Sequence, residues 1–230
     1  MILGGIMKTT LLDYPGKIAC TVFTKGCNFR CPFCHNASLV TPDRYCAEDY
    51  SEADFFSFIE KRRGILDGVV VSGGEPTLQS DINRFLYNIK NLGFDVKLDT
   101  NGAFPNKLKD ILSAGLVDYI AMDIKNSPAK YESTAQCNTL TAVRKSVDLI
   151  MSSDIEYEFR TTAVTELHSV DDFKAIGEWI RGAKKYFIQS YEDSGDILSA
   201  LPFSAPETDT LNAFLCAARE NVPSAELRGI

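Results

Sequence analysis

One pattern recurs along most of the chain: a short run of β-branched and apolar residues is followed by a longer stretch with helical apolar periodicity. Six such runs predict strands at 18–23, 68–72, 95–99, 119–123, 157–162 and 186–190. Periodicity with start and stop signals predicts helices at 51–63, 80–92 and 107–114, and further helix faces around 143–151, 173–180 and 211–215. Strands that alternate with helices predict right-handed crossovers and a parallel sheet.

Polar residues fall at the C-terminal ends of several of these strands. SGGEP follows 68–72, DTNG ends 95–99, DIK ends 119–123, RTT ends 157–162, and Gln189 ends the last run. In a barrel these strand ends converge on one mouth, where the chemistry of such folds takes place. The distribution therefore favours an α/β fold, a partial (β/α)6 TIM-like barrel of parallel strands, over an open doubly wound sheet.

The chain shows no low-complexity linker, so residues 1–230 are predicted to form a single domain. Residues 1–17 are expected to pack on the barrel, and 207–230 to supply a helix with room for a final strand. The least regular stretches, 35–50, 126–138 and 191–206, are predicted to be loops over the mouth.

Composition excludes several classes of protein. The net charge is −7, and the largest basic cluster is KRR at 61–63, which argues against a nucleic-acid footprint. No apolar run approaches the roughly 18–20 residues of a membrane span, and the N-terminus lacks the pattern of a signal peptide. We therefore expect a cytoplasmic protein that binds neither nucleic acid nor membrane. Four of its seven cysteines are scattered and are expected to be reduced packing thiols: Cys20, Cys46, Cys137 and Cys216.

The other three cysteines, Cys27, Cys31 and Cys34, lie in the spacing C-x3-C-x2-C after the first predicted strand. They could be three free thiols, although such a group needs some reason to stay reduced together. They could hold zinc with His35 as fourth ligand, although adjacent ligands rarely close a tetrahedron. They could instead hold a [4Fe–4S] cluster with one iron left open for another molecule, which the spacing favours.

The cysteine motif, with Phe33 directly before its last cysteine, resembles the radical S-adenosylmethionine (SAM) superfamily. The resemblance continues through most of the chain, in LLDYPGKIACTVFTKGCNFRCPFCHN, VVVSGGEPTLQ, VKLDTNG, DYIAMDIK and YEFRTT. These segments look like those of the anaerobic ribonucleoside-triphosphate reductase activating proteins. That group belongs to the glycyl-radical-enzyme activases.

The resemblance implies an activity and its cofactors. Cys27, Cys31 and Cys34 would bind one [4Fe–4S] cluster, whose open iron would take the amino and carboxylate groups of SAM. Reductive cleavage would yield a 5′-deoxyadenosyl radical that generates a glycyl radical on a partner, anaerobic ribonucleotide reductase. A flavodoxin or ferredoxin would supply the electron. The resemblance also allows a monovalent cation.

The resemblance also implies which residues contact SAM. Gly73, Gly74 and Glu75 would meet its amino group, Asp99 and Asp123 would orient the ammonium and ribose, and Lys125 would meet the carboxylate. The remaining expected contacts are Thr100, Asn101, Arg160, Gln189 and, as a platform for adenine, Phe33. Alternatives stay open: GGEP and Asn101–Gly102 would also serve as turns, Lys125 as a surface charge, and Arg160 as the partner of a mouth carboxylate.

The remaining predictions concern the roles of the two histidines and three alternative functions. His35 and Asn36 are placed to tune the cluster potential or to shape the loop, while His168 is expected to be solvent-exposed or a helix cap. One alternative function is activation of another glycyl radical enzyme of the pyruvate formate-lyase type. A radical SAM reaction on a small molecule, such as a deazapurine ring contraction, is another. A non-catalytic iron–sulfur carrier is the alternative from a different class.

Overall fold

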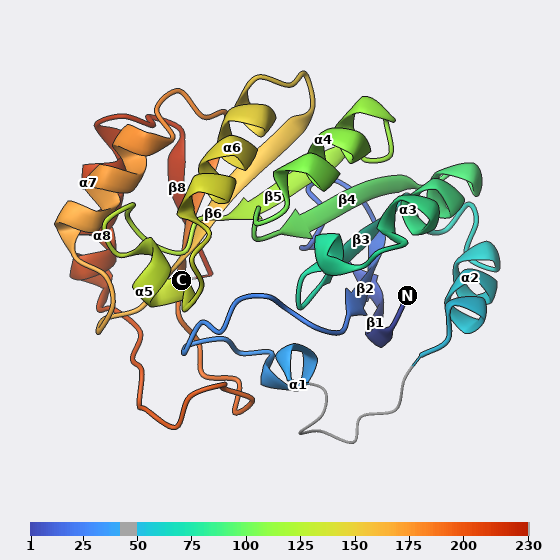
Figure 1. The fold of residues 1–230 in the computed structure, drawn as a ribbon, viewed down its shortest axis with the longest axis horizontal. Coiled ribbons are helices and arrows are strands. Elements are labelled where there is room, and N and C mark those ends of the chain that lie inside the picture. Colours follow the sequence, from blue (N-terminus) through green and yellow to red (C-terminus); the bar gives the residue numbers. More distant parts are fainter. Residues whose placement is uncertain (42–49, 230) are drawn as a thin grey trace.

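The computed structural model describes residues 1–41 and 50–229 and contains one curved sheet of eight strands in the order β1 to β8 (Figure 1). The strands are β1 (Leu3–Thr10), β2 (Ala19–Thr24), β3 (Gly68–Gly73), β4 (Asp95–Thr100), β5 (Tyr119–Asp123), β6 (Glu156–Ala163), β7 (Tyr186–Ser190) and β8 (Ala225–Arg228). β1 pairs with β2 antiparallel, and every later neighbouring pair is parallel. The sheet therefore has the polarity of an open, partial barrel.

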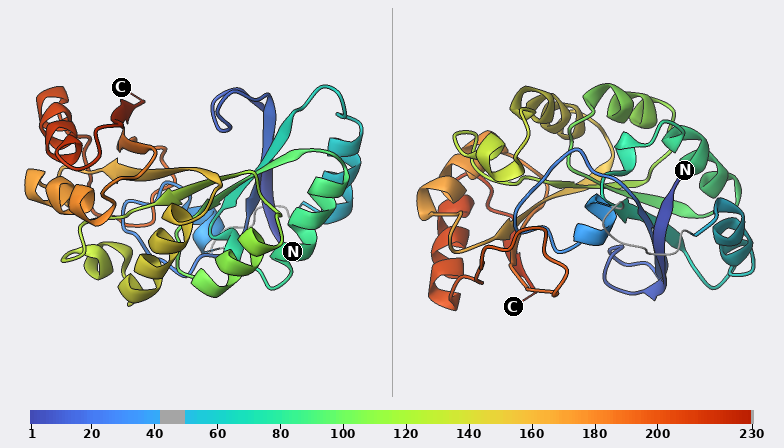
Figure 2. Two further views of the ribbon diagram at one scale, coloured as in Figure 1. Left: turned by 90° about the horizontal axis from the view of Figure 1, so that it is seen from above. Right: turned by 60° about the horizontal axis from the view of Figure 1, so that its bottom comes forward.

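Helices connect the parallel strands in sequence order. They are α1 (Ala37–Val40), α2 (Glu52–Glu60), the 3-10 turn η2 (Pro76–Leu78), α3 (Ile82–Asn91), α4 (Pro105–Ser113), α5 (Tyr131–Ala135), α6 (Leu140–Met151), α7 (Val170–Trp179) and α8 (Thr208–Arg219). Ser51 caps α2 by accepting from Asp54 N, as its sequence predicts. The long helices lie along one side of the sheet, while α1 and the 191–206 segment lie on the other (Figure 2).

The two faces of the sheet differ because successive strand residues point to opposite sides. The outer face is apolar and packs against the helices, with Val22, Val69, Leu98 and Phe159 in one buried core with Phe85. The inner face is largely polar. Its polar members include Thr21, Ser72, Lys97, Asp99, Asp123, Glu158, Arg160, Thr162 and Gln189. This inner face is where a site can form.

All six predicted strands are confirmed, and each occupies one of β2 to β7. The final strand expected within 207–230 is β8, which brings the parallel strands to seven. β1 adds an antiparallel strand within 1–17 that the sequence analysis did not predict. Of the predicted loop at 35–50, residues 42–49 lie outside the described residues, and the described part contains α1. The predicted loop at 126–138 contains α5, and 191–206 has no helix or strand. No helix in the described ranges is long and apolar enough to cross a membrane.

Two predictions about single residues were wrong. His168 is buried rather than exposed, and its ring nitrogens contact the backbone of Val164 and Lys125, because the turn before α7 folds over the end of β5. The helix cap is the next residue, Ser169. Cys216 is exposed on α8, whereas Cys20 is fully buried as expected. Cys46 lies outside the described residues.

Candidate active site

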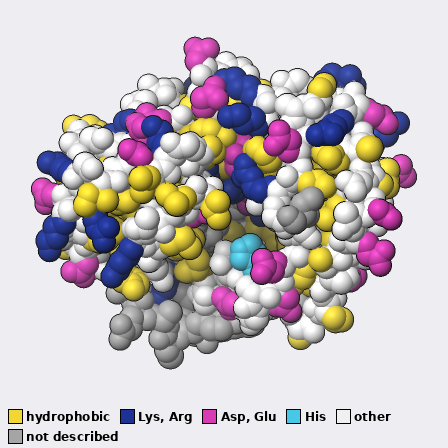
Figure 3. All heavy atoms as spheres, turned by 180° about the vertical axis from the view of Figure 1, so that it is seen from behind, with side chains coloured by type: hydrophobic (Ala, Val, Ile, Leu, Met, Phe, Trp, Pro, Cys, Tyr) yellow, Lys and Arg dark blue, Asp and Glu magenta, His cyan; other side chains and the backbone are white. Residues whose placement is uncertain are grey.

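A cavity of about 390 Å³ opens at the C-terminal ends of the parallel strands. It is lined by all fourteen residues that the sequence singled out: Cys27, Cys31, Phe33, Cys34, Gly73, Gly74, Glu75, Asp99, Thr100, Asn101, Asp123, Lys125, Arg160 and Gln189. The view from behind shows a hollow bordered by basic, acidic and hydrophobic side chains and a histidine (Figure 3). Residues from six separate segments therefore meet in one space of the size of a small-molecule site.

The three cysteines of the 27–34 loop all face this cavity. Cys31 is buried, and Cys27 and Cys34 are partly exposed. Burial raises the pKa of the Cys27 thiol to about 11 and that of Cys31 to about 12, and it raises the pKa of Cys34 as well. Thiolate is the form that binds metal, so ligation at these positions has to release protons.

The cysteine loop is held by a segment far away in the sequence. Leu198 N donates to Cys34 O at 3.1 Å, and Ser199 N donates to Pro32 O at 3.1 Å. The Asp196 carboxylate accepts from Ser38 N at 3.1 Å and from Ser38 Oγ at 2.7 Å, just beyond the loop. The irregular 191–206 segment therefore acts as a brace, which its sequence does not reveal.

The arrangement of ligand-type side chains does not suit a single metal ion. No three His, Cys, Asp or Glu side chains in the described ranges converge closely enough to hold one ion. His35 is exposed on the rim of the cavity. The cysteines alone supply three thiolates on one loop, and an iron–sulfur cluster is larger than one ion and is held by thiolates. This donor set fits a cluster better than the zinc site considered from the sequence.

Two glycines after β3 are required by the close approach of the chain's own backbone. Gly73 has φ +125°, and a Cβ there would lie 2.2 Å from Thr24 N. A Cβ on Gly74 would lie 2.1 Å from Gly26 O, at the start of the cysteine loop. Both positions need glycine, because any side chain would clash with backbone atoms. The GGEP turn is thus fitted directly against the cysteine loop.

Glu75 uses its carboxylate to join three segments around the cavity. Oε1 accepts from Thr77 N at 2.9 Å, from Thr77 Oγ1 and from Thr100 Oγ1 at 2.8 Å, while Oε2 accepts from Asn101 N at 2.6 Å. The side chain is 1% exposed. Burial raises the pKa of Glu75, and the four donors partly offset this effect. Glu75 lines the cavity but acts within the chain as a bracket between GGEP and DTNG.

Asn101 carries this bracket on to the cysteines. Its side-chain Nδ2 donates to Asn28 Oδ1 at 3.0 Å and lies 3.8 Å from Cys27 Sγ, within reach of a weak hydrogen bond to sulfur. Its Oδ1 accepts from Ala103 N at 2.9 Å, which fixes the orientation of the amide. Asn101 is therefore not simply a turn residue, since it links the end of β4 to the first cysteine.

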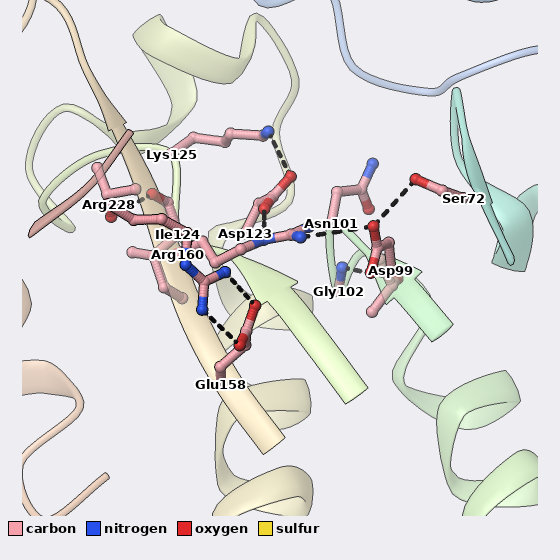
Figure 4. Close-up of polar contacts among 12 residues, drawn as sticks. Ser72, Asp99, Asn101, Gly102, Asp123, Ile124, Lys125, Glu158, Arg160 and Arg228 are labelled. Carbon is pink, nitrogen blue, oxygen red and sulfur yellow. Dashed lines mark hydrogen bonds and ion pairs between the residues drawn. The ribbon is translucent and has the colours of Figure 1, made fainter. Parts of the chain in front are cut away.

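A row of ion pairs crosses the inner face of the sheet (Figure 4). Arg160 donates from Nε to Asp123 Oδ1 at 3.0 Å and from Nη1 to Asp99 Oδ2 at 3.4 Å. Lys125 Nζ lies 2.9 Å from Asp123 Oδ2. Although burial opposes the shift, Arg160 and then Lys125 lower the pKa of Asp123, and Arg160 and then Lys97 lower that of Asp99. Both carboxylates are therefore ionised, and the prediction that Arg160 pairs with a mouth carboxylate is confirmed.

Several polar residues of the site were missed from the sequence. Ser72 Oγ donates to Asp99 Oδ2 at 3.1 Å, and Lys97 Nζ pairs with Asp99 Oδ1. Thr162 follows Arg160 on the same face of β6 and lines the cavity. The alternation of side chains in β3, β4 and β6 could have revealed them. Each lies two residues from a predicted site residue, so the two residues lie on the same face of the sheet.

Comparisons with known proteins agree with this geometry. The profile of the Radical SAM superfamily matches residues 21–179. The chain belongs to the radical SAM superfamily. Over 200 residues it is 31% identical to a protein of Methanocaldococcus jannaschii provisionally named a glycyl-radical enzyme activating enzyme, covering 83% of this chain and 80% of that one.

Two further proteins are similar to this chain, one in sequence and one in fold. It is 35% identical over 136 residues to the pyruvate formate-lyase-activating enzyme of Listeria monocytogenes, covering 52% of each chain. Streptococcus suis SuiB bound to its precursor peptide SuiA shares the fold, with a TM-score of 0.70 and 12% identity, over 91% of this chain and 48% of that one. The second likeness concerns architecture alone.

Membership in the radical SAM family implies an enzyme with a [4Fe–4S] cluster and SAM. The residues present fit both groups. Three thiols lie on one buried loop beside the cavity, and the cavity wall next to them carries the ammonium of Lys125 and the guanidinium of Arg160. These are the donors that a cluster and an amino-acid carboxylate require.

Proposed function

We propose that residues 1–230 form one radical SAM domain that generates a glycyl radical on a partner enzyme, most specifically an anaerobic ribonucleoside-triphosphate reductase. The observation that carries this proposal is the meeting of three cysteines and eleven polar or apolar cavity residues at the mouth of the partial barrel. When bound, the cluster and SAM would supply a 5′-deoxyadenosyl radical able to abstract hydrogen from a glycine.

In this proposal Cys27, Cys31 and Cys34 ligate the cluster. Asn101 restrains Cys27, and the 191–206 brace holds the backbone at Cys34 and Pro32. Burial keeps water from Cys31, while Cys27 and Cys34 are partly exposed toward the cavity. The brace and the amide therefore have a positioning role rather than a chemical one.

The other end of the cavity would hold the amino-acid part of SAM. Lys125 lines the same cavity as the three cysteines and pairs with Asp123 at 2.9 Å. It would meet the carboxylate, with Arg160 beside it. The backbone of Gly73 and Gly74 and the carboxylate of Asp99 would face the ammonium. Phe33, Thr100, Asn101, Asp123 and Gln189 line the remaining wall, with Phe33 as the candidate platform for adenine.

The glycyl radical partner is inferred from the relatives. The relative from Methanocaldococcus jannaschii aligns over most of both chains and carries the name of a glycyl-radical enzyme activator. The motif resemblance to ribonucleotide reductase activases favours that reductase. A pyruvate formate-lyase-type partner is the second candidate, and the 35% identity to Listeria activating enzymes favours it. An electron donor of the flavodoxin or ferredoxin type would reduce the cluster.

The decisive experiment uses the anaerobically reconstituted protein with each candidate partner, SAM and a reductant. We expect a glycyl radical signal by electron paramagnetic resonance with the reductase, and 5′-deoxyadenosine in comparable amount. A glycyl radical signal only with a formate-lyase would mean that the proposed activity is right but that the partner is the formate-lyase. Production of 5′-deoxyadenosine without any protein radical would favour a small-molecule substrate. No 5′-deoxyadenosine from protein with a full cluster would refute the radical SAM activity and leave an electron carrier.

A monovalent cation beside Asp99 and Asp123 is the one implied group that the residues do not fit. Both carboxylates already contact cationic side chains of this chain: Lys97 and Arg160 at Asp99, and Arg160 and Lys125 at Asp123. Asp99 also accepts from Ser72. A metal ion there would need oxygen ligands free of other positive charges.

A further inference from the structure

Lys97 is the most deeply buried cation of the inner face. It lies on β4 two residues before Asp99, so both side chains point to the same side of the sheet. Its side chain is 1% exposed, and Nζ forms an ion pair with Asp99 Oδ1. An ammonium group removed from water is costly unless it is paired and hydrogen-bonded. The position therefore has to serve a specific carboxylate.

Asp99 is engaged on both of its oxygens. Oδ1 receives Lys97, and Oδ2 receives Ser72 at 3.1 Å and Arg160 at 3.4 Å. The carboxylate is 16% exposed, and it forms part of the cavity wall. The Lys97 ammonium thus lies behind the wall, on the strand side of Asp99, while the cavity lies on the other side.

The charges of the whole row leave no need for another cation. Lys97, Arg160 and Lys125 supply three positive charges against the two carboxylates of Asp99 and Asp123. Glu158, two residues before Arg160 on β6, adds no net charge, because Arg228 forms a bidentate ion pair with it at 2.9 and 3.1 Å. The row therefore carries one positive charge in excess, which an incoming carboxylate would balance and a metal cation would increase.

We propose that the Lys97 ammonium occupies the role of a bound monovalent metal ion next to Asp99, so that this protein binds SAM without K⁺ or Na⁺. The inference rests on the proposed function, because it concerns how the SAM site is neutralised. A lysine ammonium is a compact point charge, and the strand holds it in place at every salt concentration. The site is then built complete by the chain itself, and Lys97 is a positioning residue that sets the charge behind Asp99.

The first test measures SAM binding to the reconstituted wild-type protein by isothermal titration. Chloride salts of tetramethylammonium, Na⁺ and K⁺ are compared at one ionic strength, so that only the identity of the cation changes. We expect dissociation constants that agree within about twofold, because the site takes up no metal ion. An affinity that rises about fivefold or more in Na⁺ or K⁺ would overturn the inference.

The second test removes the ammonium with Lys97→Met, which keeps the length of the side chain. In tetramethylammonium this variant should bind SAM about tenfold more weakly, and Na⁺ or K⁺ should restore much of the loss. Lys17→Met is the matched control, since Lys17 pairs with Asp95 at the opposite end of the same strand. It should behave as the wild type in every salt. A Lys97→Met protein whose affinity is unchanged would also overturn the inference.

Crystals soaked in rubidium chloride give a readout that is independent of SAM. Anomalous density is expected beside Asp99 Oδ1 in Lys97→Met, at the place that the Lys97 ammonium occupies in the wild type, and none is expected there in the wild type. A wild-type peak at Asp99 would refute the inference. If the wild-type protein with a full cluster binds no SAM in any of the three salts, the proposed function fails and this inference fails with it. Cation-dependent SAM binding, by contrast, overturns only the role of Lys97, whether or not Lys97→Met folds.

Discussion

Arg160 and Asp123 face each other in register across the β5–β6 pair, with Nε 3.0 Å from Oδ1. The same guanidinium reaches Asp99 on β4, so one side chain ties together the C-terminal ends of three parallel strands (Figure 4). The two carboxylates raise the pKa of Arg160 against the effect of burial, and the charge is fixed. The planar fork of arginine suits this double role, which a lysine could not fill.

Replacing Arg160 by methionine should therefore harm both the site and the fold. Asp99 and Asp123 would each lose a partner, and removing one member of a buried pair costs about 3–5 kcal/mol. We expect SAM affinity to fall by at least about tenfold, together with a clear loss of stability. Titration of SAM and thermal unfolding of the reconstituted protein measure the two effects.

Arg84→Met serves as the control, because Arg84 forms exposed ion pairs with Glu52 and Asp81 outside the cavity. It should leave SAM binding unchanged. Arg160→Lys should recover part of the stability but not the affinity, since an ammonium can serve only one of the two carboxylates well. Wild-type affinity in Arg160→Met would show that the row of ion pairs is structural only.

The Glu75 bracket leads to a second prediction. Glu75→Gln keeps the shape but turns one acceptor oxygen into a donor that faces Thr77 or Asn101, so a buried donor is left without an acceptor. Loss of such a bond costs about 1–3 kcal/mol. We expect the free energy of unfolding of the reconstituted protein to fall by this amount in chemical unfolding. We also expect the cysteine loop to be held less firmly. Glu132→Gln, at an exposed position on α5, should cost almost nothing.

A weaker cysteine loop in Glu75→Gln has its own readout. Iron should be lost to a chelator faster than from the wild type, because Asn101 N is bound to Glu75 while its side chain restrains Cys27. Equal rates of iron loss would show that the bracket stabilises the fold without reaching the cysteines.

The ligand assignment leads to a third prediction. Cys31→Ala removes the buried thiol of the motif, and two thiolates cannot hold the cluster stably. Iron, sulfide and the visible absorbance of the cluster should all be lost after reconstitution. Cys216→Ala changes an exposed thiol on α8 and should retain them. Full iron and sulfide content in Cys31→Ala would contradict the assignment of the three ligands.

The sequence predicts the parallel strands and most of the cavity residues because both leave a signal within a short stretch of sequence. Strands covered by helices need apolar outer faces, and polar residues at their ends mark the mouth; both signals are local. β1 gives a weaker signal, because it pairs antiparallel at an edge and has only Leu3 and Thr10 buried. Its Gly4 and Gly5 are also unusual in a strand.

What the sequence could not supply are the contacts between distant segments. The brace from 191–206 holds Cys34 and Pro32 by backbone hydrogen bonds, which leave no trace in residue type. Glu75 looked like a contact for SAM, but its partners Thr77, Thr100 and Asn101 meet only after β3 and β4 are placed side by side. Lys97 was overlooked because a lysine in a strand usually faces water, whereas this one is 1% exposed and pairs with Asp99.

Asp172 leads to the fourth prediction, which concerns stability against pH. It closes a capping box with Ser169 at the start of α7, and it also accepts from Ser127 Oγ at 2.7 Å and pairs with Lys130 at 2.6 Å. Burial opposes the shift, but Lys130, Ser169 and Ser127 together lower the pKa of Asp172 to about 2. A carboxyl with a lowered folded pKa stabilises the fold above its unfolded pKa and loses this effect as the pH falls.

Asp172→Ala should accordingly destabilise the protein by about 2–3 kcal/mol near neutral pH. The difference from the wild type should be constant down to about pH 4 and shrink as the pH approaches about 2, where the wild-type carboxyl takes up its proton. Chemical unfolding across this pH range measures it. Asp171→Ala, one residue earlier on the exposed side of the same helix turn, should show a small difference that varies little. A deficit for Asp172→Ala that grew on acidification would mean that the charge of Asp172 does not stabilise the fold.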